Sequence, residues 1–469
     1  MAPLLSKLVV LGGLAGFAAS QASVTVDVGT KFQQIDGFGF SQAFGRAKEF
    51  QNAPAATQQK ALDYLFNATT GAGFSIIRNR VGSGGRGDSI LPTSPGSPSG
   101  KPSYVWDKDD GGQFWFTKQA ASYGVKTIYA DAWSAPGFMK TSGSDSSPGF
   151  LCGTTGHTCS SGDWRQAYAD FLVQYVKYYN DAGLTVTHLG FLNEPDYSPG
   201  YSQMQISTNA QEAISFIPIL HETAAAAGVN VSLTCCDAMG WQMQSTYTTA
   251  LVNAGSTQYL GVITSHSYTS DAKTPLSQTG LTKWNTEAGP GSGNGNTFVT
   301  TWYSRGANEE GFTWAQKIAT AMVNAQLSAY LFWEGFEIKQ TQSGSHLVDA
   351  TDGTNATPSG IFWAFAMWSR HIRPGALRVA ASGAPNGFIT GAFQNVDGSV
   401  VVVFTNTGSG AQSVKTSFTG VSSNTAPQAW LTNQDNKFAS TEAKADGGAF
   451  TVSIPGRSVV TLKMAGGSG

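Results

Sequence analysis

The amino-acid sequence predicts an α/β fold, a (β/α)8 barrel of the TIM type with an attached β-sandwich side domain. Two observations lead to this prediction. Between Gln34 and Glu334, apolar strand-like runs alternate with helical segments, as in a parallel sheet whose helices pack outside it. After Gly375 the helical pattern ends, and short β-rich runs follow one another around turn residues such as Asp397-Gly398.

Eight runs in the first part of the chain have the length and apolar content of buried strands. They are Ile35–Phe40, Phe74–Arg80, Lys126–Trp133, Val186–Glu194, Val231–Ala238, Leu260–Tyr268, Leu281–Glu287 and Ala329–Phe336. The clearest helix between them is Asp163–Gly183, with an acidic start, a periodic apolar stripe and a terminal glycine. Eight strand–helix units are the number that closes such a barrel.

The same patterns divide the chain into segments. We expect the barrel at residues 34–374, the β-sandwich at 375–469 and, at 21–33, an N-terminal strand that joins the sandwich, because Ser23–Gly29 alternates like a strand. Residues 1–20 are expected to form a signal peptide: Lys7 precedes the apolar stretch Leu8–Ala19, which is too short to span a bilayer. We therefore expect a secreted, extracellular protein.

Composition argues against two classes of partner. The formal net charge is −2 and only 12% of residues are charged, so the chain lacks the clustered Lys and Arg of a nucleic-acid groove or a basic membrane face. Aromatic residues make up 12% of the chain, including 12 Trp. This content fits either an aromatic-rich core or a surface that binds sugar rings. We expect a monomer.

The cysteines and sequons fit an oxidising compartment. Cys152 and Cys159 enclose a flexible Gly/Thr loop and are expected to form a disulfide. Cys235 and Cys236 are adjacent, so they either close a vicinal ring or stay reduced. No CxxC or HExxH pattern accompanies them, which argues against a zinc site. We expect no cofactor. Three sequons mark possible N-glycosylation sites, Asn67, Asn230 and Asn355, although Pro358 disfavours the last.

Polar and aromatic residues stand at the carboxyl ends of six of the eight predicted strands. They are Arg78 and Arg80, Trp133, Asn193 and Glu194, His266 and Tyr268, Glu287, and Trp333 and Glu334. A closed parallel barrel brings these strand ends together on one face, where catalytic residues of such barrels lie. His266 either lines this cleft or is a hydrogen-bonded structural histidine. Glu334 and Glu337 are either substrate contacts or structural.

Glu194 and Glu287 form the central pair. Two carboxylates in one sugar-sized cleft are what glycoside cleavage needs, one protonated to donate and one ionised to attack. Arg78 and Tyr268 are expected to hydrogen-bond Glu287 and favour its charged form. Glu194 has no cation nearby in sequence, so we expect desolvation to raise its pKa.

At these residues the sequence resembles glycoside hydrolase family 30 of clan A. The stretches DGFGFSQAF (Asp36–Phe44), GFLNEPD and WNTEAGPG, with the trailing sandwich, carry the resemblance over nearly the whole mature chain, and the fungal xylanase-like subgroup is the most similar. The resemblance implies a retaining enzyme that needs no metal. It also implies the following roles: Glu194 as acid/base, Glu287 as nucleophile, Asn193 on the sugar 2-hydroxyl, Trp133 and Trp333 as sugar-facing platforms, and Arg78 near the nucleophile.

The resemblance implies an endo-acting hydrolase of β-1,4-xylan, with glucuronoxylan as the expected form. Exo-acting xylobiohydrolases, β-1,6-galactanases and β-1,6-glucanases are alternatives within the family, and a carbohydrate-binding protein without catalysis is a non-enzyme alternative. Arg46 lies in the loop after the first strand and is expected to bind the carboxylate of a glucuronic acid branch. The competing interpretation pairs Arg46 with Glu49 on the first helix.

Overall fold

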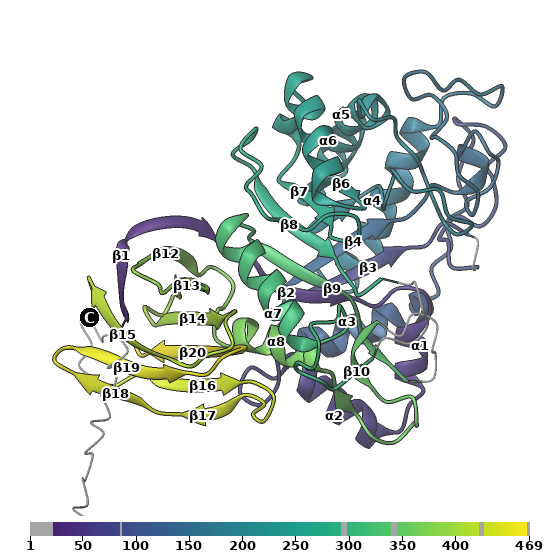
Figure 1. The fold of residues 1–469 in the computed structure, drawn as a ribbon. Helices are drawn as coiled ribbons and strands as arrows, with labels where there is room; N and C mark the ends of the chain where they lie inside the picture. The colour runs from purple at the N-terminus through teal and green to yellow at the C-terminus, as the bar shows by residue number, and fades with distance from the viewer. Residues whose placement is uncertain (1–21, 85–86, 292–297, 339–344, 422–425, 467–469) are drawn as a thin grey trace, which may run out of the picture.

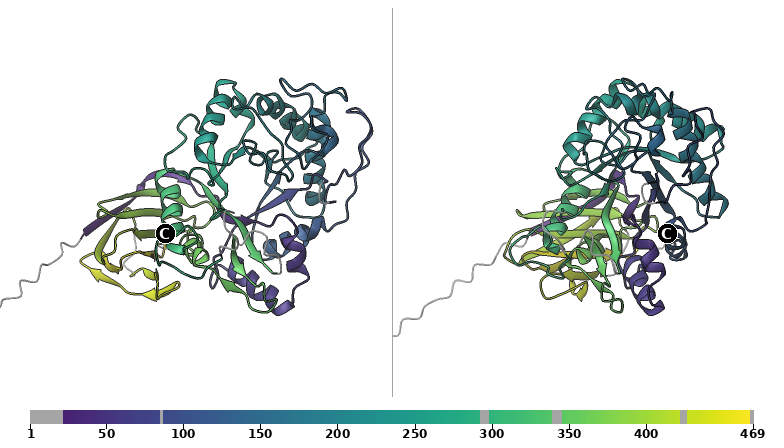
Figure 2. Two further views of the ribbon diagram at one scale, coloured as in Figure 1. Left: turned by 45° about the vertical axis from the view of Figure 1, so that its right-hand side comes forward. Right: turned by 90° about the vertical axis from the view of Figure 1, so that its right-hand side faces the viewer.

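The computed structural model describes residues 22–84, 87–291, 298–338, 345–421 and 426–466. The expected signal peptide at residues 1–20 lies outside these ranges. Figure 1 shows a barrel beside a smaller β-rich domain, and the two further views in Figure 2 show the β-rich domain against one side of the barrel. In the described part of the chain, no helix is long and apolar enough to cross a membrane.

Parallel strands close the barrel, as the sequence predicts. They are β2 (Gly37–Ser41), β3 (Ile76–Val81), β4 (Thr127–Ala132), β5 (His188–Gly190), β6 (Ser232–Ala238), β7 (Val262–His266), β8 (Thr282–Glu287) and β9 (Ala329–Glu337). Each strand pairs in parallel with the next, and β9 pairs with both β8 and β2, which closes the sheet. Two short strands, β10 (His346–Asp349) and β11 (Thr357–Pro358), extend from β9.

Helices follow most of the strands. They are α1 (Arg46–Gln51), α2 (Ala55–Phe66), α3 (Gln113–Ser122), α4 (Arg165–Asp181), α5 (Gln211–Ala226), α6 (Trp241–Asn253), α7 (Gly311–Ala319) and α8 (Gly360–Ser369). Short helical turns lie at Asp110–Gly112, Gly137–Met139, Ser256–Tyr259 and Thr320–Asn324. The predicted helix Asp163–Gly183 is α4, which lies within those bounds.

The second domain is a ten-stranded sheet. Its strands are β1 (Ala22–Gln34), β12 (Leu377–Ser382), β13 (Phe388–Gln394), β14 (Val400–Asn406), β15 (Gln412–Thr419), β16 (Gln428–Thr432), β17 (Ala439–Thr441), β18 (Ala443–Asp446), β19 (Ala449–Ile454) and β20 (Ser458–Met464). The N-terminal strand β1 lies between β12 and β15, antiparallel to the first and parallel to the second. The first described residues therefore belong to the same sheet as the last ones.

Two helices join the domains. Figure 1 shows α7 and α8 between the barrel strands and the sandwich. Thr461 Oγ on β20 donates a hydrogen bond to the Met367 carbonyl on α8 at 2.7 Å, and Trp302 Nε1 donates to the Arg457 carbonyl at 2.7 Å. These bonds hold the sandwich against the barrel.

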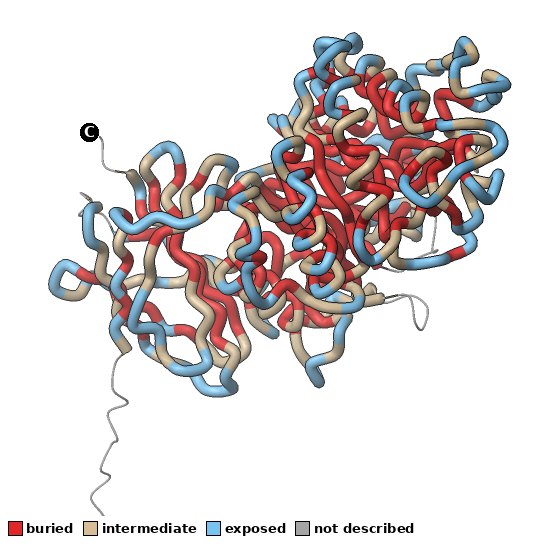
Figure 3. The backbone as a smooth tube through the Cα atoms, turned by 90° about the horizontal axis from the view of Figure 1, so that it is seen from above, coloured by how far each residue is buried: buried red, intermediate tan, exposed pale blue. Residues whose placement is uncertain are grey.

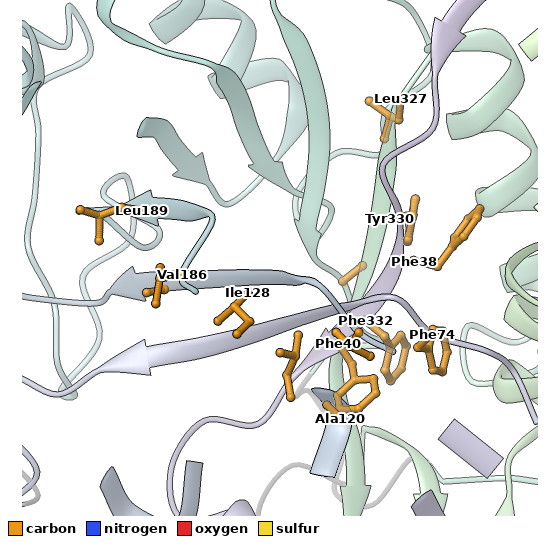
Figure 4. Packing of buried hydrophobic residues seen from close by; sticks show 14 of the residues in the cluster. Phe38, Phe40, Phe74, Ala120, Ile128, Val186, Leu189, Leu327, Tyr330 and Phe332 are labelled. Atoms are coloured by element: carbon orange, nitrogen blue, oxygen red, sulfur yellow. The ribbon is translucent and has the colours of Figure 1, made fainter. Parts of the chain in front are cut away.

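Aromatic side chains fill much of the core. Phe40 on β2 lies with its ring centroid 5.5 Å from that of Phe74 and 6.3 Å from that of Phe336 (Figure 4). Inside the barrel, the rings of Tyr129 and Trp284 lie 6.2 Å apart. Figure 3 shows buried backbone running through the barrel interior and the middle of the sandwich. Much of the aromatic content is therefore core.

Both cysteine pairs are disulfides. Cys152 and Cys159 are bonded with their Cα atoms 5.5 Å apart, as expected, and close the loop that leads into α4. Cys235 and Cys236 form the vicinal disulfide, which is one of the two states left open by the sequence. Of the three sequon asparagines, Asn230 and Asn355 are exposed and Asn67 is half-buried, and their glycosylation stays a prediction.

A buried carboxyl between α3 and α4 predicts a pH-dependent stability. Asp110 Oδ2 accepts hydrogen bonds from the hydroxyls of Tyr175 and Tyr179, each at 2.6 Å. Burial raises the pKa of Asp110 from 3.8 to about 7, although the two tyrosines lower it. Because the folded-state pKa is raised, its contribution to stability is full below pH 3.8 and is lost as the pH rises to about 7.

Asp110→Asn, which mimics the protonated acid, should therefore stabilise the protein at pH 8 relative to wild type and much less at pH 4. The free energy of unfolding of Asp110→Asn minus that of wild type should increase by up to about 4 kcal/mol from pH 4 to pH 8. Denaturant unfolding at several pH values measures it. A difference that is constant with pH would contradict the raised pKa.

Candidate active site

The carboxyl ends of β5 and β8 bring Glu194 and Glu287 together. Glu287 is the last residue of β8, whereas Glu194 lies four residues beyond the end of β5 with a left-handed φ of +47°. The Glu194 backbone is fixed on both sides: its N–H donates to the Asp237 carbonyl at 2.8 Å, and its own carbonyl accepts from Gln203 Nε2 at 2.6 Å. One carboxylate oxygen of each glutamate lies within 4.8 Å of the other.

Two donors hold Glu287. Arg78 Nη1 donates to Glu287 Oε2, and the Tyr268 hydroxyl donates to Oε1 at 2.8 Å. Both contacts are those expected from the sequence. Burial raises the pKa of Glu287, and the positive charges of His266 and Arg78 act against this shift.

A histidine holds Glu194. His266 Nδ1 lies 3.0 Å from Glu194 Oε1 and 3.8 Å from Glu287 Oε1, so the imidazole lies beside both carboxylates. Burial alone would lower the pKa of His266, but the negative charge of Glu287, the hydrogen bond to Glu194 and the charge of Asp237 raise it. Glu194 has no cation nearby in sequence, but β7 supplies His266 from far along the chain.

Arg78 hydrogen-bonds several polar side chains at the bottom of the site. Its guanidinium is fully buried, and Nη2 donates to Asp131 Oδ2 at 2.7 Å and to Asn193 Oδ1 at 2.6 Å. The positive charge therefore links Glu287 to the amide that precedes Glu194. Since Asn193 Oδ1 is occupied by Arg78, the Nδ2 donors of this amide are the ones left for a substrate hydroxyl.

Two buried aspartates in this network were not predicted. Asp131 and Asp237 are fully buried and both approach Arg78, Asp237 at 3.6 Å. Burial and the charge of Asp237 raise the pKa of Asp131 well above its usual value, whereas the charges of Arg78 and His266 lower the pKa of Asp237 despite its burial. The available signal was an aspartate inside an otherwise apolar strand. Gly190 is required beside it, because an added Cβ would lie 2.1 Å from Asp131 Oδ1.

The two tryptophans differ in exposure. Trp133 is only 1% exposed, and the guanidinium of Arg78 lies 4.3 Å from its ring centroid. The expectation of an open sugar-facing platform at Trp133 is therefore corrected: this ring supports Arg78. Trp333 is half-buried, and its ring centroid lies 6.3 Å from that of Trp133 and 6.1 Å from that of Phe44. Trp333 thus remains the more exposed ring of the pair.

Arg46 is not free to bind a substrate branch. Its guanidinium is 3% exposed, with Nε 2.6 Å from Glu334 Oε1 and Nη2 3.3 Å from Glu337 Oε1. The pairing with Glu49 is not what the structure shows either. Because the acidic partners come from β9 and are themselves buried, Arg46 neutralises charge inside the barrel wall. Glu334 and Glu337 accordingly have the structural role.

This pairing predicts a loss of stability. Arg46→Ala leaves Glu334 and Glu337 buried without their cation, which should lower the free energy of unfolding by about 3–5 kcal/mol. Arg165→Ala is the control, since its bond to the exposed Asp163 should contribute less than about 1 kcal/mol. Thermal and denaturant unfolding measure both. If Arg46→Ala kept wild-type stability and lost activity only on glucuronoxylan, the buried ion cluster would not be the role of Arg46.

In the described ranges, one group of side chains is compact enough to hold a metal ion: Glu194, His266 and Glu287, whose ligand atoms lie within 4.8 Å of one another. The contacts of these carboxylates are with proton donors, Arg78 and Tyr268 on Glu287 and His266 on Glu194. The arrangement therefore fits a pair of carboxylates of which one attacks as an anion and the other gives and takes a proton.

Two family models match this chain, one over the barrel and one over the sandwich. Residues 35–371 match the family model described as glycosyl hydrolase family 59, and residues 375–462 match that of the glycosyl hydrolase family 30 β-sandwich domain. The catalytic domain of GH30 xylanase C from Talaromyces cellulolyticus is 45% identical with a TM-score of 0.88, and the match covers 94% of this chain and 99% of that one.

More distant relatives differ in what they act on. The GH30 subfamily 8 xylanase Xyn30A from Clostridium acetobutylicum is 22% identical, with a TM-score of 0.71 over 94% of this chain and 99% of that one, and shares the fold. An endo-1,6-β-D-glucanase from Aspergillus fumigatus is 27% identical over 422 residues, which are 80% of this chain and 79% of that protein.

Proposed function

The chain belongs to glycoside hydrolase family 30, and from this premise we propose that it cleaves β-1,4-xylan internally with retention of anomeric configuration. The premise rests on the sandwich match and on the 45% identity that spans almost all of a family 30 xylanase. The observation that carries the mechanism is the pair of carboxylates, whose oxygens approach within 4.8 Å. Inverting enzymes keep the two groups about 6.5–9.5 Å apart to admit a water, and retaining enzymes about 5–5.5 Å.

Glu287 is the nucleophile in this proposal. Its two donors, Arg78 and Tyr268, aim at an anion and hold the carboxylate in one orientation. In the first step Glu287 attacks the anomeric carbon, the bond to the leaving oxygen breaks, and Glu194 gives that oxygen its proton. In the second step the Glu194 carboxylate takes a proton from water, whose oxygen displaces Glu287.

The surroundings fit this cycle. When Glu194 has lost its proton, the bond from His266 Nδ1 stabilises the carboxylate, and His266 also lies near Glu287 when that group carries charge. Asn193, fixed by Arg78, presents its Nδ2 donors to the sugar 2-hydroxyl, where hydrogen bonds strengthen in the transition state. No separate base is needed.

The substrate is the finer part of the proposal. The relative with 45% identity is a xylanase, which favours β-1,4-xylan. The preference for glucuronic acid branches rested on Arg46, and the burial of Arg46 removes that support. The 27% identical endo-1,6-β-glucanase favours a second candidate, a β-1,6-glucan hydrolase with the same mechanism.

A substrate panel tests the choice. The purified enzyme is incubated with glucuronoxylan, arabinoxylan, β-1,6-galactan and β-1,6-glucan, and new reducing ends and product lengths are measured. We expect reducing ends and a range of xylo-oligosaccharides from the two xylans. Xylobiose as the only early product would indicate exo action. Release from β-1,6-glucan alone would overturn xylan as the substrate and leave the two-carboxylate mechanism standing.

We also propose that the protein is secreted. The apolar stretch Leu8–Ala19 and two disulfides support an oxidising, extracellular destination. Mass analysis of protein from a culture supernatant tests this, since the mature chain should begin near residue 21. An intracellular protein that starts at Met1 would contradict it.

A further inference from the structure

A groove lies along helix α2, at the lower edge of the molecule in Figure 1. Its volume is about 420 Å³, within the range of about 300–1,000 Å³ that is usual for small-molecule sites. The groove is lined by Ala56, Gln59, Lys60, Asp63, Tyr64 and Thr70. It combines one aromatic ring with several hydrogen-bonding groups. A sugar needs both, because its apolar face packs on a ring while its hydroxyls need polar partners.

The aromatic and polar lining of this groove is held in place. Tyr64 is half-buried, and its ring centroid lies 5.8 Å from that of Phe362 on α8. The Tyr123 hydroxyl donates to Asp63 Oδ1 at 2.7 Å and accepts from Gln59 Nε2 at 2.8 Å. The groove is therefore already shaped before anything binds in it.

The sequon residue Asn67 lies at the end of α2 beside this groove. Asn67 is the C-cap of the helix, and its backbone N–H donates to the Asp63 carbonyl at 3.1 Å. Residues three apart on a helix are neighbours, with Cβ atoms about 5–6 Å apart, so Asn67 lies next to Tyr64. Thr70, which lines the groove, donates its N–H to Asn67 Oδ1 at 3.1 Å.

The Asn67 amide is oriented, with its nitrogen available. Oδ1 accepts from the N–H groups of Thr69 at 2.8 Å and Thr70 at 3.1 Å. Among the residues that the structure describes, Nδ2 of Asn67 has no hydrogen-bond partner. Asn355, in a second sequon, instead uses its Nδ2 to donate to Asp352 Oδ2 at 3.0 Å. A group attached to Asn67 Nδ2 would therefore displace no contact.

The turn at residues 67–72, which carries the sequon, is tied down at several points. The Gly71 N–H donates to the Asn67 carbonyl at 2.9 Å, and the Ala72 N–H donates to the Tyr64 carbonyl at 2.7 Å. From the inner side, Arg370 Nε donates to the Gly71 carbonyl at 2.5 Å. A ligand tethered to a fixed turn beside a formed groove binds there at little entropic cost.

We propose that Asn67 carries an N-linked glycan whose first sugar binds in the groove on α2, with its apolar face against the ring of Tyr64. A lipid-linked diphosphate oligosaccharide of the secretory pathway is the donor. The anomeric carbon of that donor forms a bond to Nδ2, its bond to the phosphate oxygen breaks, and Nδ2 loses one proton. Oδ1 keeps both of its hydrogen bonds. This role goes beyond the hydrolase activity, since it concerns stability and not catalysis.

Release of the glycan from the folded protein tests the contact. Protein secreted from a eukaryotic host is mapped, and Asn67 should be modified. An amidase that cleaves between asparagine and the first sugar is then applied. Release from Asn67 should be about three- to tenfold faster in Tyr64→Leu than in wild type, because the ring contact is lost. Tyr178→Leu is the matched control: Tyr178 is a half-buried tyrosine on α4 that stacks on Trp106, and its loss should leave the rate unchanged.

Thermal unfolding provides a second readout. Thr69→Ala removes the sequon but keeps Asn67 and the backbone N–H that donates to it. Loss of the glycan in Thr69→Ala should lower Tm by about 1–2 °C, and by much less when Tyr64→Leu is already present. Because Tyr64→Leu keeps an apolar side chain against Phe362, its own fold should persist.

Three results would overturn the proposal: an unmodified Asn67 in the secreted protein, equal release rates in wild type and Tyr64→Leu, or equal losses of Tm from Thr69→Ala in both backgrounds. Neither readout uses the hydrolysis of a polysaccharide. Failure of the proposed function would therefore leave both measurements unchanged and be recognised separately.

Discussion

Glu287→Gln is expected to lower kcat on xylan by roughly 10⁴-fold or more, because the amide cannot attack the anomeric carbon. Glutamine has the same shape and still accepts from Tyr268, and Arg78 keeps Asp131 and Asn193 as partners, so the fold should persist. Initial rates of reducing-end release measure the effect.

Glu222→Gln supplies the control for this experiment, since Glu222 is an exposed glutamate on α5 and its amide should leave kcat unchanged. Thermal unfolding of Glu287→Gln should show a cooperative transition. A kcat within tenfold of wild type in the folded variant would remove Glu287 from the nucleophile's role.

Glu194→Ala should show a loss that depends on the leaving group. On xylan, where the leaving oxygen needs a proton, general-acid catalysis by Glu194 should account for about 10²–10⁴-fold in rate. On 4-nitrophenyl β-xylobioside the leaving phenolate departs without that proton, so formation of the glycosyl-enzyme should slow far less. The intermediate then accumulates, because no base activates water.

Azide provides the diagnostic readout for Glu194→Ala. A small anion that needs no base can enter the space left by the carboxylate, attack the glycosyl-enzyme and restore turnover, with a glycosyl azide of retained configuration as product. Wild type should not respond in this way. Equal losses on both substrates, together with no azide effect, would mean that Glu194 is not the acid/base.

Local patterns were enough to predict the barrel strands. The predicted run Leu281–Glu287 corresponds to β8 at Thr282–Glu287, because an apolar run bounded by turns has few other ways to be buried. The fourth strand is shorter than predicted. Only His188–Gly190 pairs as β5, since the left-handed backbone at Glu194 and the ring of Pro195 take the following residues out of the ladder.

The strand-end rule also placed several side chains of the site. The sequence pointed to Glu194, Glu287, Arg78, Asn193 and Tyr268, and the structure brings them together. What it could not supply were the partners of Arg46 and the buried aspartates around Arg78. These residues are far apart in sequence, so no local pattern encodes the pairing.

Arg46 illustrates that limit. The sequence around Arg46 predicted either Glu49 or a substrate carboxylate as its partner. In the structure Arg46 pairs with Glu334 and Glu337. These residues reach it because β9 closes the barrel beside β2. Asp237 was missed for a related reason: it follows the disulfide in β6 and meets Arg78 of β3 only across the barrel interior.

The central claim is a covalent intermediate on Glu287, and trapping it is the most direct measurement. A 2-deoxy-2-fluoro xylobioside with a good leaving group forms the intermediate and slows its breakdown, because fluorine destabilises the oxocarbenium-like transition states. Mass analysis should find one added glycosyl group, and peptide mapping should place it on Glu287. An adduct on Glu194, or an inverted anomer in the products of the untreated enzyme, would contradict the account.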